Sequence, residues 1–314
     1  MPVITEDESL SSWAHRANLD VQFYLQSRER ISSRLFYGDP DFDSTPDLKT
    51  FLASREEIVS TNAFDSSTMW TIPPGVADFV CELCLRDSLK NHHALIFKKS
   101  WRYVMNPICN SHGSLLSTFP PRSTDRMQYL SNLPRSMRTR LQHKALEVIV
   151  STAHQQQIRL NSSAPSITSF AITTNRKAEV LKFIAQLFLH SGDQTGGIAS
   201  FFLTSPRPRN RHRQAMGWRL LFISGAVESS SLERACALIM LGIVSGDIGE
   251  EEINTLTAVL TSHDYFESLA PYDLGRLSKF MLPEHATSIT KRLNEYVSVM
   301  KCDAYLKFLR GFEL

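Results

Sequence analysis

Two closely spaced pairs of metal-ligating residues constrain this chain more than any other feature of its sequence. Cys81 and Cys84 form a C-x-x-C pair, and Cys109 and His112 form a C-x-x-H pair after 24 intervening residues. Two residues between the donors let both side chains of a pair reach one ion from a single tight turn. Two such pairs supply the four thiolate and imidazole donors of a tetrahedral Zn²⁺ site. The spacing therefore predicts one zinc ion bound by these four residues.

Two other interpretations of the same segment remain open at this stage. The three cysteines would be buried free thiols and His112 a surface residue if no metal binds. His92 or His93 would replace His112 as the fourth ligand, although neither has a cysteine nearby in the sequence. The two-residue spacing in both pairs favours the zinc site over these alternatives.

The donor set predicts a structural metal, because four protein ligands leave no open position for water or substrate. The sequence also lacks the phosphate loop G-x-x-x-x-G-K-[ST], a G-x-G-x-x-G after a strand and the G-x-S-x-G elbow. We therefore predict no catalytic residues and no enzymatic activity.

Composition places the chain among ordinary globular proteins of a reducing compartment. Five cysteines in 314 residues are too few and too clustered for a disulfide framework. No run of about 18 apolar residues predicts a membrane span, and the acidic N-terminus does not resemble a signal peptide. We expect a cytoplasmic, nucleoid-associated protein that does not enter a membrane.

Charge is strongly segregated along the chain. Residues 1–60 and 228–314 each carry a net charge of −5, whereas residues 90–144 carry ten bases and one acid. Such a basic middle predicts a surface that contacts nucleic-acid phosphates, although an acidic protein partner or a solvated helix face remains possible. The candidate nucleic-acid contacts are Lys98, Lys99, Arg102, Arg135, Arg138, Arg140, Arg207, Arg209, Arg211 and Arg213.

Hydrophobic periodicity predicts a mainly α fold with three parts. Residues 1–75 form an N-terminal helical module, in which short helices over 47–53 and 54–64 are a helix-turn-helix or a plain helical hairpin. Residues 76–122 form the zinc module, and residues 123–314 form a C-terminal helical domain.

Several helix boundaries and core residues follow from local signals. Ser9 or Ser11 would cap a helix that starts near the N-terminus, and Ser230 with Glu233 forms a capping box. The helix that begins at this box is expected to end near Gly246. Two further cysteines, Cys236 and Cys302, lie in apolar helical contexts, where we expect core residues.

Four segments carry a resemblance to a known family. In order they are D-E-S-L-S-S-W-A-H-R (7–16), C-E-L-C-L-R-D (81–87), S-W-R-Y (100–103) and P-I-C-N-S-H-G-S-L-L (107–116). The combination resembles the TniQ family, which includes the TniQ and TnsD proteins of heteromeric bacterial transposons. The resemblance covers about residues 5–120, and the second C-x-x-C that many members carry after C-x-x-H-G has no counterpart here.

The resemblance implies a role in selecting the target site of transposition. TniQ-like proteins connect a target-recognition module, either a CRISPR effector complex with its guide RNA or an attachment site in DNA, to an AAA+ transposition ATPase. They do not catalyse strand transfer, and a homodimer is plausible for adaptors of this kind. By position, Cys81, Cys84, Cys109 and His112 match the family's zinc ligands. The alternative implied by the same family is a stand-alone, sequence-specific DNA-binding protein of TnsD type.

Overall fold

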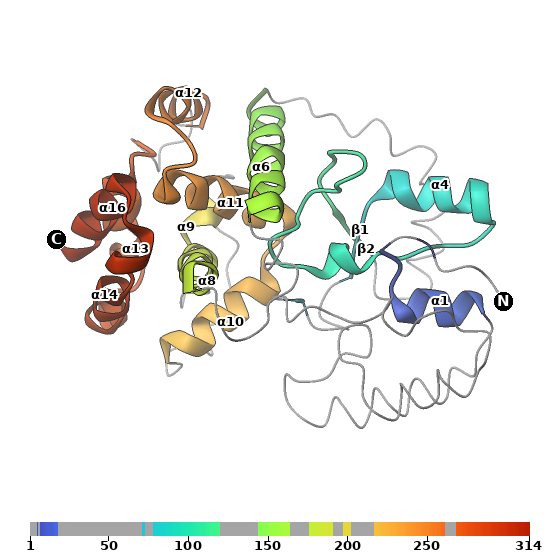
Figure 1. Cartoon of the computed structure of the whole chain (residues 1–314), viewed down its shortest axis with the longest axis horizontal. Coiled ribbons are helices and arrows are strands. Elements are labelled where there is room, and N and C mark those ends of the chain that lie inside the picture. Colours follow the sequence, from blue (N-terminus) through green and yellow to red (C-terminus); the bar gives the residue numbers. More distant parts are fainter. Residues whose placement is uncertain are drawn as a thin grey trace. The chain divides into compact units, whose positions relative to one another are not determined.

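The computed structural model describes residues 5, 7–17, 71–72, 78–119, 144–163, 176–190, 197–201, 217–260 and 268–314. These residues are mainly helical, which confirms the expected fold class (Figure 1). They fall into two compact units, one containing the described residues up to 119 and the other those from 144 onward. None of the described helices is long and apolar enough to cross a membrane.

The described part of the first unit combines short helices with a small sheet. Its elements are α1 (Leu10–Arg16), β1 (Asp78–Val80), α4 (Glu82–His92), the 3-10 helix η2 (Lys99–Arg102) and β2 (Ser117–Phe119). The strands β1 and β2 pair antiparallel, with Val80 opposite Ser117 and Asp78 opposite Phe119. Because β1 directly precedes Cys81 and β2 closely follows His112, this pairing brings the two ligand pairs to the same place.

Aromatic side chains form the core of the first unit. Trp13 of α1, Leu85 of α4, Trp101 of η2 and Phe119 of β2 are all nearly fully buried. The ring of Phe97 packs edge-on against both Trp101 and Phe119, at centroid distances of 6.4 and 5.4 Å. The apolar segment between the ligand pairs therefore contributes Phe97 and Trp101 to this core, with η2 as its helical turn.

The second unit is built from helices in its described part. They are α6 (Lys144–Ser163), α8 (Arg176–Leu189), α9 (Ile198–Phe201), α10 (Trp218–Glu228), α11 (Ser231–Ser245), α12 (Glu250–Leu260), α13 (Pro271–Phe280), η5 (Pro283–His285), α14 (Ala286–Glu295), α15 (Val297–Met300) and α16 (Asp303–Glu313).

Helix α11 is the centre of the second unit. Nearly all of its residues are buried, and it packs against α6, α8, α9 and α16. The predicted capping box is present, since Ser230 Oγ accepts from the Glu233 N–H and the Glu233 carboxylate accepts from the Ser230 N–H. The helix ends at Gly246 with a φ of 78°, as its sequence predicted.

Two glycines allow α13 and α16 to cross at very short range. A Cβ atom on Gly275 would lie 2.0 Å from the carbonyl oxygen of Phe308, and one on Gly311 would lie 1.9 Å from that of Tyr272. Backbones approach this closely only where side chains are absent. The crossing buries Phe308 and Phe312 of α16 completely.

Several sequence predictions lie outside the described residues. They include the helix pair over 47–53 and 54–64 and the first turns of the helix expected from Arg135, whose described part is α6. The division into residues 1–75, 76–122 and 123–314 stays a prediction.

Candidate metal centre

The first ligand pair lies where β1 meets α4. Cys81 occupies the N-cap position of α4, in an extended backbone conformation, and Cys84 lies in the first turn of that helix. The Cys81 carbonyl accepts a hydrogen bond of 3.0 Å from the Leu85 N–H, which anchors the turn. The α-helical turn thus orients both sulfurs toward one point.

The second ligand pair lies on a tight turn that Gly113 makes possible. The Cys109 N–H donates to the Ser114 carbonyl and the Gly113 N–H donates to the Cys109 carbonyl, both at 2.8 Å. Gly113 has a φ of 61°, a left-handed conformation that glycine adopts without the steric cost of a side chain. This turn therefore requires the glycine that follows His112 in the sequence.

The four side chains form a tetrahedral donor set. Their ligand atoms all lie within 4.8 Å of one another. His112 Nδ1 is 3.5 Å from Cys81 Sγ, 3.2 Å from Cys84 Sγ and 3.7 Å from Cys109 Sγ. The sulfurs of Cys84 and Cys109 are 3.6 Å apart. A regular tetrahedron with zinc-like bond lengths has S···N edges of about 3.6 Å and S···S edges of about 3.8 Å. The cluster is therefore the right size and chemistry to hold one metal ion.

The pKa values of the three thiols depend on one another. Hydrogen bonding with Cys109 and Cys84 lowers the pKa of Cys81. Hydrogen bonding with Cys109 and Cys81, together with burial, raises the pKa of Cys84, and hydrogen bonding with Cys81, together with burial, raises the pKa of Cys109. The three thiols therefore do not ionise independently of one another. A bound cation is what would allow all three to be thiolates.

Two further residues contact the ligands from outside the tetrahedron. Asp87 Oδ2 lies 3.2 Å from His112 Nε2, and Ser114 Oγ lies 3.4 Å from Cys81 Sγ. Sequence reasoning missed both residues. Asp87 lies three residues after Cys84, a spacing that places both on one face of a helix. This signal could have indicated Asp87, but only if the segment after Cys81 had been recognised as a helix.

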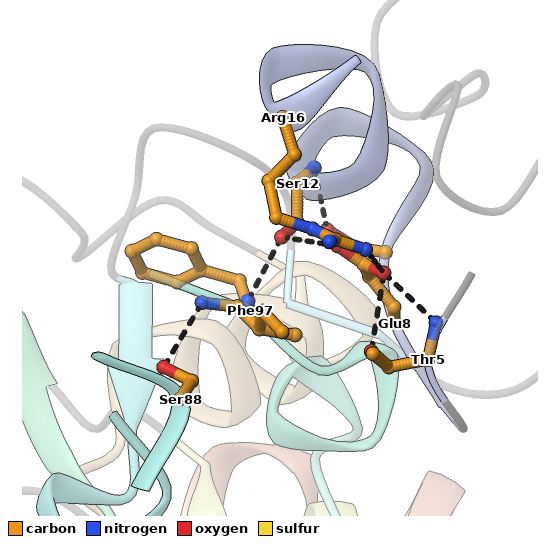
Figure 2. Close-up of polar contacts among 8 residues, drawn as sticks. Thr5, Glu8, Ser12, Arg16, Ser88 and Phe97 are labelled. Atoms are coloured by element: carbon orange, nitrogen blue, oxygen red, sulfur yellow. Dashed lines mark hydrogen bonds and ion pairs between the residues drawn. The ribbon is translucent and has the colours of Figure 1, made fainter. Parts of the chain in front are cut away.

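The N-terminal motif docks directly onto the segment between the ligand pairs. Figure 2 shows the buried carboxylate of Glu8 accepting hydrogen bonds from Thr5, Ser12 and Arg16, the last also forming an ion pair of 2.7 Å. Ser12 Oγ in turn accepts a hydrogen bond of 3.0 Å from the Phe97 N–H. Helix α1 is therefore fixed to residues that are far away in the sequence.

Backbone contacts extend this docking on both sides of Phe97. The Ser9 N–H donates to the Phe97 carbonyl at 2.9 Å, and Ser9 Oγ caps α1, as one of the two predicted caps. The Asp7 carboxylate accepts from both the N–H and the hydroxyl of Ser100, and the Asp7 carbonyl accepts from the Lys99 N–H at 2.8 Å. Asp7 thus satisfies amide groups at the start of η2.

The candidate nucleic-acid contacts differ in their exposure to solvent, and most of them lie outside the described residues. Lys98 and Lys99 are partly exposed, and Lys98 Nζ donates to Ser111 Oγ at 3.4 Å beside the second ligand pair. Arg102 is buried and its guanidinium donates to the Ile72 carbonyl at 2.8 Å, so the expectation that it faces a polyanion is corrected. The other candidates lie outside the described residues, namely Arg135, Arg138, Arg140, Arg207, Arg209, Arg211 and Arg213.

The remaining histidines and cysteines of interest lie apart from the cluster. His92 and His93 are exposed at the C-terminal end of α4. Cys236 is fully buried in α11, as predicted, whereas Cys302 is partly exposed at the start of α16. Within the described ranges, Cys81, Cys84, Cys109 and His112 are the one group of such residues that could bind a metal.

Comparison of the chain with protein-family models, with curated proteins and with solved structures found no match in any of the three.

Proposed function

We propose that this protein is a non-catalytic adaptor for target-site selection in transposition, with one structural zinc ion. In this role it would connect a target-recognition module, either a CRISPR RNA-guided complex or attachment-site DNA, to an AAA+ transposition ATPase. The observation that carries the proposal is that the four segments resembling TniQ lie in one compact unit, where the first contacts the third and the second contacts the fourth.

The contacts between these segments are specific to the motif residues. Glu8 and Ser12 of the first segment make the hydrogen bonds that dock α1 on Phe97, next to the S-W-R-Y segment. The second and fourth segments supply the four converging ligands. Short segments that matched a family pattern by chance would have no reason to meet in the fold.

The donor chemistry supports zinc in a structural role. Three sulfurs and one imidazole nitrogen at tetrahedral spacing suit zinc, which has no geometric demand beyond four soft or borderline donors. Cys81, Cys84 and Cys109 are nearly fully buried, and no donor position is left for water. An ion bound there would stabilise the fold and take no part in catalysis.

The metal is tested by elemental analysis of protein purified from zinc-replete medium. We expect about one zinc per chain, and Cys109→Ser should lose both the metal and much of the stability because a zinc site contributes binding energy to folding. Cys236→Ser, in the core of the other unit, is the matched control and should keep the metal. Metal-free but fully stable wild-type protein would contradict the proposal.

The adaptor role is tested by binding experiments with purified components. The full chain is mixed with the AAA+ ATPase encoded beside its gene and ATP, and complex formation is followed by size-exclusion chromatography with light scattering. A complex that persists in the absence of DNA supports the adaptor. The absence of such a gene, or of any complex, argues against it.

DNA binding separates the adaptor from the stand-alone TnsD-like alternative. Nanomolar, sequence-selective binding by the protein alone at about 150 mM salt would favour the alternative, since specific complexes fall in that range. For the adaptor we expect weak binding that decreases steeply with salt. Replacing Lys98 and Lys99 by Gln should weaken it uniformly across sequences.

A further inference from the structure

We infer that Asp87 is a positioning residue of the metal centre, which orients the His112 ring so that Nδ1 is the atom that binds the metal. The inference rests on the metal site proposed above and deepens it. Asp87 ends the C-E-L-C-L-R-D segment but lies outside both ligand pairs, and its role comes from the geometry of α4.

The His112 ring is oriented with its two nitrogens toward different partners. Its Nδ1 faces the three sulfurs at 3.2–3.7 Å, while its Nε2 faces Asp87 Oδ2 at 3.2 Å. An imidazole that gives its Nδ1 lone pair to a metal carries its proton on Nε2. That N–H then donates to the carboxylate, which fixes the tautomer and makes the ring a stronger ligand.

The four ligands differ in their exposure to solvent. The three cysteines are buried, whereas the His112 side chain is 25% exposed and is the donor that solvent can reach. An exposed imidazole is the ligand that rotates away most easily, and metal loss would begin there. A second contact on the outer side of the ring therefore has most effect at this ligand.

Helix α4 sets the position of the Asp87 carboxylate. Asp87 is 59% exposed, so packing does little to fix its side chain. Its position comes from the helix itself, because Cys84 and Asp87 are one turn apart on the same face of α4. One helix thus carries both a ligand and the residue that orients the ligand across from it.

The inference predicts faster metal loss when the carboxylate is removed. Outer partners of this kind change metal affinity by about 10- to 100-fold. We expect Asp87→Ala to release zinc at least about 10-fold faster than wild type, and Asp87→Asn, which keeps the shape and a weaker acceptor, to fall in between. Glu284→Gln, which removes one exposed carboxylate from the second unit, is the matched control and should equal wild type.

The experiment uses the full, zinc-loaded chain. Transfer of zinc to an excess of a chromophoric chelator gives the release rate, and elemental analysis gives the starting stoichiometry. The absorption spectrum of the Co²⁺-substituted protein reports whether the S₃N coordination is kept. A nitrogen–proton correlation NMR spectrum of wild type identifies which His112 nitrogen is protonated.

The outcomes separate this inference from the site itself. A wild-type chain that binds no metal overturns both. A wild-type chain that binds one zinc, with equal release rates in wild type and Asp87→Asn, overturns only the role of Asp87. A proton on Nδ1 of metal-loaded wild type also overturns it, and this measurement holds even if Asp87→Ala fails to fold.

Discussion

Single residues hold together segments of the first unit that the sequence places far apart. Gly113 allows the turn that carries Cys109 and His112, and the buried carboxylate of Glu8 collects the hydrogen bonds of α1. Neither residue belongs to the cluster: Gly113 shapes the turn of the second ligand pair, and Glu8 holds Ser12, which binds the Phe97 N–H. Their contributions can be separated by substitutions that leave the four ligands in place.

The left-handed turn predicts a cost for any side chain at Gly113. Gly113→Ala should lower the free energy of unfolding by about 1–2 kcal/mol, because a Cβ disfavours a φ of 61°. Chemical denaturation followed by circular dichroism measures the change. Gly217→Ala is the control, because that glycine has a φ of −63° and open space around the Cβ position. Equal effects of both substitutions would contradict the prediction.

Neutralising Glu8 should be far more damaging than neutralising an exposed carboxylate. Glu8→Gln removes the negative charge that pairs with the guanidinium of Arg16, which is itself mostly buried. Breaking a buried ion pair costs about 3–5 kcal/mol, and we expect a loss near the lower end because hydrogen bonds to the amide remain. Thermal and chemical denaturation measure it. Glu251→Gln on the exposed side of α12 should change little, and a comparable loss there would refute the prediction.

Asp7 should make stability depend on pH in an unusual direction. Burial outweighs the hydrogen bonds from Ser100 and the charges of Lys98 and Lys99, and it raises the pKa of Asp7 above its usual 3.8. Between 3.8 and the raised value the folded protein binds more protons than the unfolded chain. The contribution of Asp7 to the free energy of unfolding therefore falls as the pH rises through this window.

Comparison with Asp7→Asn isolates this effect. The difference in unfolding free energy, wild type minus variant, should decrease as the pH rises from about 4, and it should level off once Asp7 is ionised in both states. Both proteins carry the same cluster of three cysteines and one histidine, so its own pH dependence cancels. A difference that is flat or that increases with pH would contradict the raised pKa.

At the scale of elements, the closest packing lies at the crossing of α13 and α16. Gly275 and Gly311 each lie against the backbone of the other helix, so the two helices fit together at two points. The contact occurs between short amphipathic helices whose buried faces contain Leu274, Tyr305 and Phe308. The glycines set the distance at which these side chains pack.

Adding one methyl group at this crossing should push the helices apart. Gly275→Ala or Gly311→Ala should each lower the free energy of unfolding by about 1–3 kcal/mol, the usual cost of overpacking. The double variant should cost less than the sum, because one separation relieves both clashes. Denaturation midpoints measure both effects. Gly249→Ala, with open space around the Cβ position, is the control. Strict additivity would indicate two independent sites.

Local signals predicted some elements well and others not at all. The caps Ser9 and Ser230 and the end of α11 at Gly246 depend on neighbouring residues, so their sequence patterns were sufficient. Helix α4 was missed because its polar residues give a weak apolar periodicity and its start coincides with a metal-binding pattern. Without that helix, neither Asp87 nor its contact with His112 could be derived.

The burial of Arg102 and the Glu8 network were missed for a different reason. Arg102 lies in a basic, aromatic run that is typical of a phosphate-binding surface, but the pairing of Thr71 with Tyr103 covers it with another part of the chain. The partners of Glu8 depend on the docking of α1 onto Phe97. Contacts between distant segments produce no repeating pattern in the sequence and could not be predicted from it. The four residues of the cluster could be predicted, because their spacing within each pair is a local pattern.

At the scale of the whole molecule, the described parts of the two compact units have different centres. The described part of the first has few regular elements and gathers around the metal-ligating cluster, whereas the second has the apolar centre provided by α11. A bound metal adds its binding free energy to the stability of the unit that contains its ligands. The two units should therefore respond differently to metal removal.

Chelation of the metal should unfold the first unit selectively. Hydrogen–deuterium exchange of the zinc-loaded chain, with and without a strong chelator, should show increased exchange in α1, α4 and η2. Amides of α11 should keep their protection, because its core contains no ligand. Re-addition of zinc is the control and should restore protection. Exchange that increases equally in both units would show that they unfold together.

The docking of α1 has a consequence for how the chain acquires its fold during synthesis. The bonds from Phe97 to Ser12 and from Ser100 to Asp7 join residues 85 and 93 positions apart. Helix α1 leaves the ribosome before residues 97–100, on which it docks. At a typical elongation rate of about 5–20 residues per second, α1 waits for several seconds with Leu10 and Trp13 uncovered. During these seconds the N-terminal segment is exposed to chaperones and proteases.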